Sequence, residues 1–463
     1  MSKTVLKLIL TATSALIFTS CGAQSATKTL NTPQNETKTT AKNVIIFIGD
    51  GMGVSTVTAA RIFDGQSKGL KGEEHALAFE DFENLALIKT YNTNAQVPDS
   101  AGTATAILSG YKTNIGAVNV RPNKSVTKMV LNSCVLKNSP PNLTERAHKA
   151  GLSVGVISTA RITHATPAAM YGHAVDRGWE AEKDVDERAV KARCKGLSTQ
   201  LLKNTPEISL GGGRQKFTDE QIKDWSAKDG HIYVEDTAGL RAAPKDQTIL
   251  GLFTPSHMSY EADRDETLEP SLAEMTGIAV DALAARGTGY VLMVEAGRVD
   301  HAHHETNAYR AMTDMQALNE AVKRAKAKSG DDTLILVTAD HSHVFTIAGY
   351  PARGNPILGL VRHPDPESGG VAKDYAKADD GKPYTTLGYQ NGPNIRAADS
   401  PALTDNMVQA RDFQQQAGVL LNTETHSGED VALYATGPGA QKVRGVMDQD
   451  EIYGVITKAL GWE

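Results

Sequence analysis

The stretch Val44-Ile45-Ile46-Phe47-Ile48-Gly49-Asp50-Gly51-Met52-Gly53 decides the fold prediction for this chain. Five consecutive apolar residues followed by glycine are typical of a strand buried on both faces of a sheet. The glycines then permit a tight turn, and residues 54–63 can form a helix. Because ligands of open α/β sheets bind at the carboxyl ends of strands, Asp50 is a candidate site residue.

The same pattern recurs along the chain. Strand-like runs lie at 153–158, 290–294, 334–338 and 431–435, and helical stretches lie at 100–109, 143–150, 271–285 and 308–327. Strands that alternate with helices predict an α/β fold whose sheet is covered on both faces. Residues 345–422 are rich in Gly, Pro, Asp and Asn and weakly periodic, which predicts a long irregular insertion.

The bulk composition is that of an ordinary globular protein. The chain has 463 residues, 40% of them hydrophobic and 22% charged, and a formal net charge of -6. This mild acidity argues against nucleic acid as a partner, because phosphate backbones are bound by basic surfaces.

The N-terminus has the features of an export signal. Lys3 and Lys7 flank the start of an apolar run over 8–18, which is too short to span a membrane. The run ends in Phe18-Thr19-Ser20-Cys21, similar to a lipoprotein cleavage site; ordinary signal cleavage is the alternative. We therefore expect a signal peptide over 1–21, a flexible tether over 22–42 and a catalytic domain over 43–463. The expected location is periplasmic or cell-surface, with a lipid anchor on Cys21.

The two other cysteines are Cys134 and Cys194. An exported protein meets oxidising conditions, so one disulfide between them is the expectation, and two separate buried thiols are the alternative.

Acidic and imidazole residues follow several predicted strands. Glu295 ends one strand and precedes a cluster at 300–305, a second cluster lies at 340–343, and a third at 424–426. Crowded carboxylates repel one another unless a cation is present. Aspartate with histidine suits zinc, and an all-oxygen set suits magnesium. The alternative is that these residues belong to separate surface loops.

Ser100 stands at the predicted start of a helix, after Asp99. The N-terminus of a helix favours a bound phosphate, and a metal ion could lower the pKa of the hydroxyl and make it a nucleophile. The alternative is that Ser100 or Asp99 only caps the helix.

From about Asn43 to its end, the chain resembles the alkaline phosphatase family. The resemblance is carried by Ile48-Gly49-Asp50-Gly51-Met52-Gly53, Asp99-Ser100-Ala101, Val294-Glu295 with Asp300-His301-Ala302-His303-His304, Thr338-Ala339-Asp340-His341-Ser342-His343 and Glu424-Thr425-His426-Ser427-Gly428-Glu429-Asp430. It implies a three-layer sandwich with a mostly parallel central sheet, and metal-dependent hydrolysis of phosphate monoesters through a phosphoserine on Ser100.

The resemblance also implies roles for individual residues. Two zinc ions are expected, one held by Asp300, His304 and His426, the other by Asp50, Asp340 and His341 with Ser100 at its open position; one magnesium ion is expected on Asp50, Thr166 and Glu295. Arg177 is expected to clamp the phosphate, with His164 and His301 beside it, as in the animal-type enzymes. His303 and His343 are expected to support the site without binding metal. Cys134 and Cys194 match an animal-type disulfide pair.

A calcium site is only partly matched. Glu269 fits one ligand position and Phe253 could supply a backbone carbonyl, but Thr254 stands where a carboxylate is expected, and the segment near 206–213, which brings another acidic ligand in the family, is shortened. Calcium therefore remains an alternative and is not an expected cofactor. The family also implies a homodimer, with Tyr350 and the insertion reaching the partner subunit.

Three other functions compete with this interpretation. Related phosphodiesterases usually have threonine as nucleophile and lack the arginine clamp and the third metal, unlike Ser100, Arg177 and Glu295. A sulfatase needs a Cys/Ser-x-Pro-x-Arg context, which Ser100 lacks. A surface metal-binding protein that kept only the scaffold would show a damaged ligand set, and the set is intact.

Overall fold

The computed structural model describes residues 40–122, 139–397 and 399–462. Its central feature is a ten-stranded sheet with the order β15-β2-β14-β8-β1-β7-β3-β4-β6-β5. The strands are β1 Asn43–Gly49, β2 Asn84–Lys89, β3 Ser153–Arg161, β4 Ile208–Gly212, β5 His231–Val234, β6 Thr248–Leu252, β7 Tyr290–Ala296, β8 Thr333–Ala339, β14 Val431–Thr436 and β15 Gly445–Asp448.

Strand β1 lies near the middle of the sheet, and all seven of its residues are buried. It pairs in parallel with β7 on one side and β8 on the other, so that Gly49 lies opposite both Ala296 and Ala339. The residues that follow these three strands therefore meet at one edge of the sheet. This register brings Asp50, Glu295 and Asp340 together although they lie far apart in the sequence.

The sheet is mostly parallel, as predicted. Strand β14 is the exception, because it runs antiparallel to both of its neighbours, β2 and β8. The predicted strands at 44–48, 153–158, 290–294, 334–338 and 431–435 are all present.

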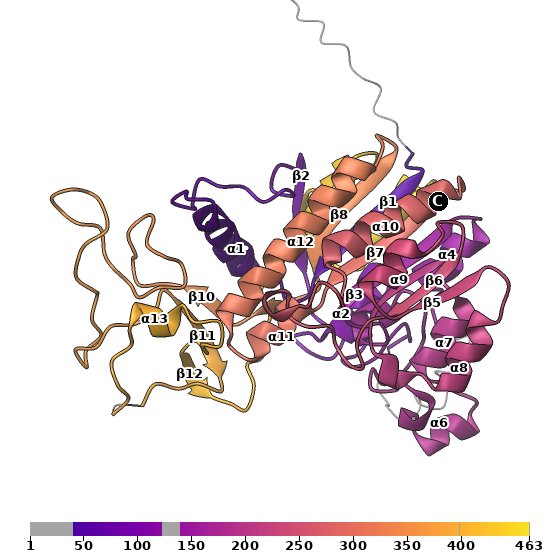
Figure 1. Cartoon of the computed structure of the whole chain (residues 1–463), viewed down its shortest axis with the longest axis horizontal. Helices are drawn as coiled ribbons and strands as arrows, with labels where there is room; N and C mark the ends of the chain where they lie inside the picture. The colour runs from indigo at the N-terminus through magenta and orange to yellow at the C-terminus, as the bar shows by residue number, and fades with distance from the viewer. Residues whose placement is uncertain (1–39, 123–138, 398, 463) are drawn as a thin grey trace, which may run out of the picture. The chain divides into compact units, whose positions relative to one another are not determined.

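Helices flank the sheet as predicted (Figure 1). Helices α10 and α12 pack together and contact β7, whereas α2 packs with α5 and α14, and α5 contacts β3 and β7. The helices are α1 Val54–Ser67, α2 Ser100–Ser109, α4 Leu143–Lys149, α5 Ala165–Ala168, α6 Glu187–Lys191, α7 Leu197–Asn204, α8 Asp219–Ser226, α9 Thr237–Ala242, α10 Leu272–Ala285, α11 Arg298–His304, α12 Ala308–Lys328, α13 Asp405–Val408 and α14 Glu451–Ala459.

The segment 345–422 contains little regular structure. It contributes a three-stranded sheet of β10 Phe345–Ile347, β11 Leu387–Gly392 and β12 Ala417–Leu420, in the order β10-β11-β12. A two-stranded pair of β9 Ser342–His343 and β13 His426–Ser427 flanks it in the sequence and leads into the candidate site.

Several sequence predictions fall outside the described residues. They are the signal peptide over 1–21 with the lipid anchor at Cys21, most of the tether over 22–42, and Cys134. Cys194 is buried, and its disulfide with Cys134 stays a prediction. Of the helices in the described part of the chain, none is both long enough and apolar enough to cross a membrane.

Candidate functional site

Three carboxylates meet, fully buried, at the carboxyl edge of the sheet. Asp50 follows β1, Glu295 lies in β7 and Asp340 follows β8, and none of them is exposed to solvent. Both carboxylate oxygens of Asp50, Oε1 of Glu295 and Oδ2 of Asp340 have no hydrogen-bond partner. A buried carboxylate without a partner is costly, and a bound cation is the usual compensation.

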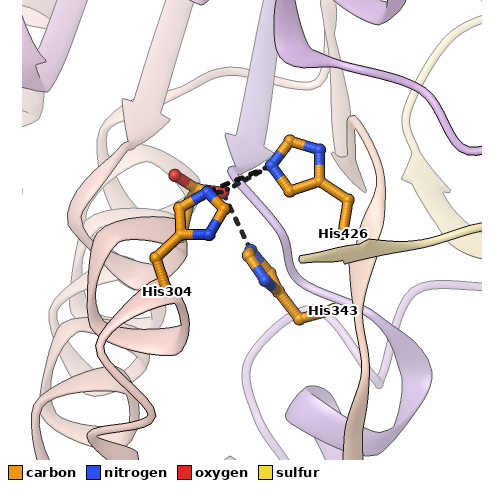
Figure 2. A group of neighbouring side chains, drawn as sticks. His304, His343 and His426 are labelled. Carbon is orange, nitrogen blue, oxygen red and sulfur yellow. Dashed lines mark hydrogen bonds and ion pairs between the residues drawn. The ribbon is translucent and has the colours of Figure 1, made fainter. Parts of the chain in front are cut away.

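The first cluster consists of Asp300, His304 and His426, with His343 beside them. Figure 2 shows how the three histidines lie relative to one another. His304 donates from Nδ1 to the carbonyl oxygen of Glu424 at 2.7 Å, and His426 donates from Nδ1 to that of Pro98 at 2.8 Å. Each neutral ring therefore has its lone pair on Nε2. These two Nε2 atoms face each other at 3.2 Å, and each lies 3.3 Å from Oδ1 of Asp300.

That spacing is the one expected around zinc. Tetrahedral ligands at 2.0–2.1 Å from a zinc ion are about 3.3 Å apart. Two lone pairs and a carboxylate oxygen at such distances repel one another unless a cation lies between them. The first cluster thus has the donor set and the spacing of a zinc site.

His343 lies beside the first cluster and bridges two carboxylates. It is buried, with Nε2 2.8 Å from Oδ1 of Asp300 and Nδ1 2.5 Å from Oε2 of Glu424. Burial alone would lower its pKa, but Glu424 and Asp300 raise the pKa of His343 to about 10. His343 can therefore donate to both carboxylates and hold Asp300 in place.

His303 is also buried and lies away from the cation positions. Its Nε2 contacts the hydroxyl of Thr56 at 3.0 Å and its Nδ1 that of Tyr389 at 2.8 Å. Both ring nitrogens are thus used in contacts between α11, α1 and β11.

The second cluster is built around His341. Its Nε2 lies 3.4 Å from Oδ1 of Asp50, 3.3 Å from Oδ2 of Asp340 and 3.1 Å from Oγ of Ser100. Oδ1 of Asp340 accepts the backbone N–H groups of Gly51 and His341, which orients the other oxygen toward the cluster. Burial, and then the charge of Asp340, raise the pKa of Asp50, so this set too is strained without a cation.

The third cluster consists of Asp50, Glu295 and Thr166, and a ring nitrogen of His164 also lies within 4.8 Å of oxygens of the two carboxylates. The hydroxyl of Thr166 is buried without a partner, and Glu295 accepts a hydrogen bond from Ser158 through Oε2, which leaves Oε1 unpartnered. Burial raises the pKa of Glu295 to about 7. These three side chains offer only oxygen atoms, which suits magnesium.

His164 lies next to the third cluster. Arg177 donates to its Nε2 at 3.0 Å, so the proton of the neutral ring is on Nδ1, which is buried without a partner. While Arg177 makes this contact, Nδ1 of His164 is a hydrogen-bond donor and cannot be a metal ligand.

Ser100 is the first residue of α2 and is almost fully buried. Asp99 caps the helix, since its Oδ1 accepts the N–H of Gly102 at 3.1 Å, and its Oδ2 accepts from Arg177 at 3.1 Å. One aspartate therefore fixes both the start of the helix and the guanidinium beside it. The backbone N–H groups of the first turn and the positive end of α2 favour an anion at Ser100.

Three residues near the site were missed by sequence reasoning. The ring of His257 lies 4.2 Å from that of His301 and 5.3 Å from that of His164, centroid to centroid. Arg161 contacts His257 at 2.5 Å, and Arg298 donates to Nδ1 of His301 at 3.0 Å. None of the three belongs to a quoted motif. Only the position of Arg298, two residues before Asp300, hinted at a place in the site.

The partial calcium motif has a different structure. Both carboxylate oxygens of Glu269 accept hydrogen bonds from Ser259, one from its hydroxyl at 2.7 Å and one from its backbone N–H at 2.8 Å. The hydroxyl of Thr254 donates to the carbonyl of Ser256 at 2.8 Å. Unlike the three clusters, these side chains already have partners within the protein.

A family model for alkaline phosphatase matches residues 41–462, almost all of the chain. The chain belongs to the alkaline phosphatase family. It is 40% identical over 451 residues to the tissue-nonspecific alkaline phosphatase of Felis catus, a match that covers 90% of this chain and 83% of the relative. It is 39% identical over 453 residues to an alkaline phosphatase of Gadus morhua, covering 90% of this chain and 91% of the relative.

Solved structures agree on the fold of this alkaline phosphatase. The enzyme of the Antarctic bacterium TAB5 matches with a TM-score of 0.65 at 22% identity, over 92% of this chain and 99% of that one. The Thermus thermophilus alkaline phosphatase matches with a TM-score of 0.65 at 22% identity, over 96% of each chain.

Family membership defines the activity and the cofactors. The protein is a phosphoric monoester hydrolase, and its reaction is metal-dependent. The family uses two zinc ions and one magnesium ion, and the described residues provide three clusters able to hold a cation.

Proposed function

We propose that Ser100 is the nucleophile of this alkaline phosphatase, and that the three clusters hold its two zinc ions and its magnesium ion. The single observation that carries the proposal is the position of Oγ of Ser100. It lies 3.1 Å from Nε2 of His341, at the start of α2 and beside the unpartnered oxygens of Asp50. A hydroxyl there faces both a cation position and the positive end of a helix.

The reaction has two balanced steps. Oγ of Ser100 attacks phosphorus, the ester oxygen leaves as the alcohol after taking a proton, and a phosphoserine remains. Water then attacks the same phosphorus, which restores the serine hydroxyl and releases inorganic phosphate. When bound, the zinc ions would lower the pKa values of the hydroxyl and of the water and stabilise the leaving oxygen.

Arg177 is assigned to the non-bridging oxygens of the phosphate. Asp99 holds one end of the guanidinium and His164 contacts the other, so the planar fork is oriented before substrate binds. A guanidinium suits two phosphate oxygens better than an ammonium group because it donates in parallel. The alcohol side of the substrate is not enclosed by this clamp, so broad specificity among phosphate monoesters is expected.

The cations are assigned by donor chemistry. The first cluster and the second cluster combine imidazole with carboxylate and are assigned to zinc, whereas the all-oxygen third cluster is assigned to magnesium. The unpartnered buried atoms of Asp50, Thr166, Glu295 and Asp340 support this assignment. Calcium at Glu269 is not proposed, because Ser259 already occupies both carboxylate oxygens.

The cellular setting is part of the proposal. The charged and apolar pattern of residues 1–21 supports export, with Cys21 as the lipid anchor and 22–42 as the tether. The proposal also includes a disulfide between Cys134 and Cys194 and the formation of a homodimer. Tyr350 supports the dimer, because its side chain is 88% exposed and its φ of 56° lies in the left-handed region, an unusual state for a solvent-facing aromatic.

The decisive experiment compares Ser100→Ala with Ser109→Ala, the same substitution at the other end of α2. With metal-loaded protein and a labelled phosphate monoester, quenching at low pH should trap a phosphoenzyme in the wild type and in S109A but not in S100A. The activity of S100A should fall by about 10³-fold or more. A labelled adduct that survives in S100A would overturn the assignment. A diester and a sulfate ester, hydrolysed far more slowly, separate the rival activities.

A further inference from the structure

Arg298 lies directly behind His301 on the same helix. The two residues are three apart in α11, which brings their side chains to one face. One terminal nitrogen of the guanidinium lies 3.0 Å from Nδ1 of His301. Neither the metal clusters nor the phosphate clamp uses Arg298.

This contact determines where His301 carries its proton. A guanidinium has only donors, so Nδ1 of His301 must accept through its lone pair. The ring is then neutral and its proton is on Nε2. No described residue forms a hydrogen bond to Nε2, so this N–H group remains available to a ligand.

Other contacts hold Arg298 in this position. Its backbone N–H donates to the hydroxyl of Thr159 at 3.2 Å, and its guanidinium lies 3.7 Å from the centre of the Tyr260 ring. Within residues 40–122, 139–397 and 399–462, no carboxylate forms an ion pair with it. The guanidinium therefore forms a hydrogen bond with His301 and no salt bridge with a described carboxylate.

We propose that Arg298 is a positioning residue that fixes the Nε2-protonated tautomer of His301, so that His301 meets the substrate's phosphate as a hydrogen-bond donor. The inference rests on the proposed function in one respect, the assignment of Arg177 to the phosphate; His301 lies beside that clamp, because its ring is 5.6 Å from the ring of His164, which Arg177 contacts. It adds a residue outside the ligand set to the machinery that recognises phosphate. With the opposite tautomer, His301 would present a lone pair to an anion, which repels it.

The test is a double-mutant cycle on metal-loaded enzyme with Arg298→Gln and His301→Ala. The readouts are kcat, KM and the inhibition constant of inorganic phosphate. R298Q alone should raise KM and the inhibition constant roughly fivefold, with kcat changed less than about twofold. In the H301A background, R298Q should change nothing further. Additive effects would overturn the proposal, because Arg298 would then act without His301.

Two variants separate positioning from mere structural support. R298K keeps a donor and a charge and should recover part of the lost phosphate affinity. Tyr260→Phe keeps the ring under the guanidinium and should leave kcat and KM unchanged. Equal losses in R298K and R298Q, or a loss in Y260F as large as that in R298Q, would overturn the proposal.

Nitrogen NMR of the histidine-labelled enzyme reads the tautomer directly. His301 should be protonated on Nε2 in the wild type and should populate both tautomers in R298Q. A wild-type His301 protonated on Nδ1 would overturn the inference. That result would leave the role of Ser100 untouched, because the trapped phosphoenzyme tests that role independently.

Discussion

Two groups of acidic residues look alike in the sequence and differ in the structure. At the carboxyl edge of the sheet, Asp50, Glu295 and Asp340 leave buried oxygens without any partner in the protein. At the partial calcium motif, Glu269 is also buried, but both of its oxygens accept hydrogen bonds from Ser259. Burial of a carboxylate therefore does not by itself indicate a bound cation, whereas a buried carboxylate oxygen without a hydrogen-bond donor does.

The largest effect is expected for a ligand at the edge of the sheet. His426→Ala removes one of the two facing Nε2 atoms of the first cluster, so zinc should be lost there and kcat/KM should fall at least about 100-fold. Metal analysis of purified protein should show close to one zinc fewer per chain. The control is His148→Ala, which changes a partly exposed histidine that belongs to none of the three clusters. If H426A kept its full zinc content, His426 would not be a zinc ligand, and the contrast between this edge of the sheet and Glu269 would fail.

A smaller effect is expected at the third cluster. Thr166→Val keeps the shape of the side chain and removes the unpartnered hydroxyl, so magnesium affinity should fall about tenfold. Activity titrated against magnesium should shift to higher concentration and reach nearly the wild-type plateau. An unchanged titration curve would mean that the hydroxyl is not a ligand.

At the partial calcium motif, a substitution should lower the stability of the protein and leave its activity unchanged. Ser259→Ala removes the hydroxyl donor to Glu269 and should cost about 1–2 kcal/mol of unfolding free energy, which lowers Tm by roughly 1–2 °C. Scanning calorimetry of the wild type with added calcium or with a calcium-selective chelator should give the same Tm. A calcium-dependent rise in Tm would show that a cation displaces Ser259, and the contrast would fail.

The smallest effect concerns Asp314, an intermediate case whose Oδ2 accepts one backbone hydrogen bond. Burial raises its pKa to about 8, well above the value of about 3.9 in an unfolded chain. Between these values the unfolded state loses its proton while the folded state keeps it, so stability falls as pH rises. Asp314→Asn lacks this titration.

The Tm of D314N relative to wild type should therefore increase from pH 7 to pH 9, by roughly 1 °C. Zinc is kept saturating at each pH, so that metal loss affects both proteins alike. A Tm difference that does not vary with pH would place the pKa of Asp314 near its ordinary value.

The centre of the fold was predictable because its strands are continuous apolar runs. Strands such as β1 and β7 are buried on both faces, so every residue carries the signal. Strand β2 was missed because it alternates: Leu85 and Leu87 are 54% and 42% exposed, and only the residues between and beyond them are buried. The antiparallel direction of β14 has no local signature, since it depends on pairing with β2 and β8.

The candidate site, like the fold, was predictable where the signal is local in the sequence. Asp300 and His304 are four residues apart, a spacing that indicates one face of a helix, and both lie in α11. His257 could not be placed, because its approach to His301 depends on how the loop after β6 folds back over α11. The tautomer of His164 depends on Arg177, which the tertiary structure brings near, whereas that of His301 depends on Arg298, one turn away on the same helix.

The position of β14 has a consequence for how the enzyme is assembled. It is among the last strands to be synthesised, yet it joins β2 and β15 to the rest of the sheet, and His426 lies just before it. Contacts so distant in the sequence form late and slowly. Under the assignment of zinc proposed above, capture of the metal at the first cluster is therefore coupled to completion of this part of the sheet.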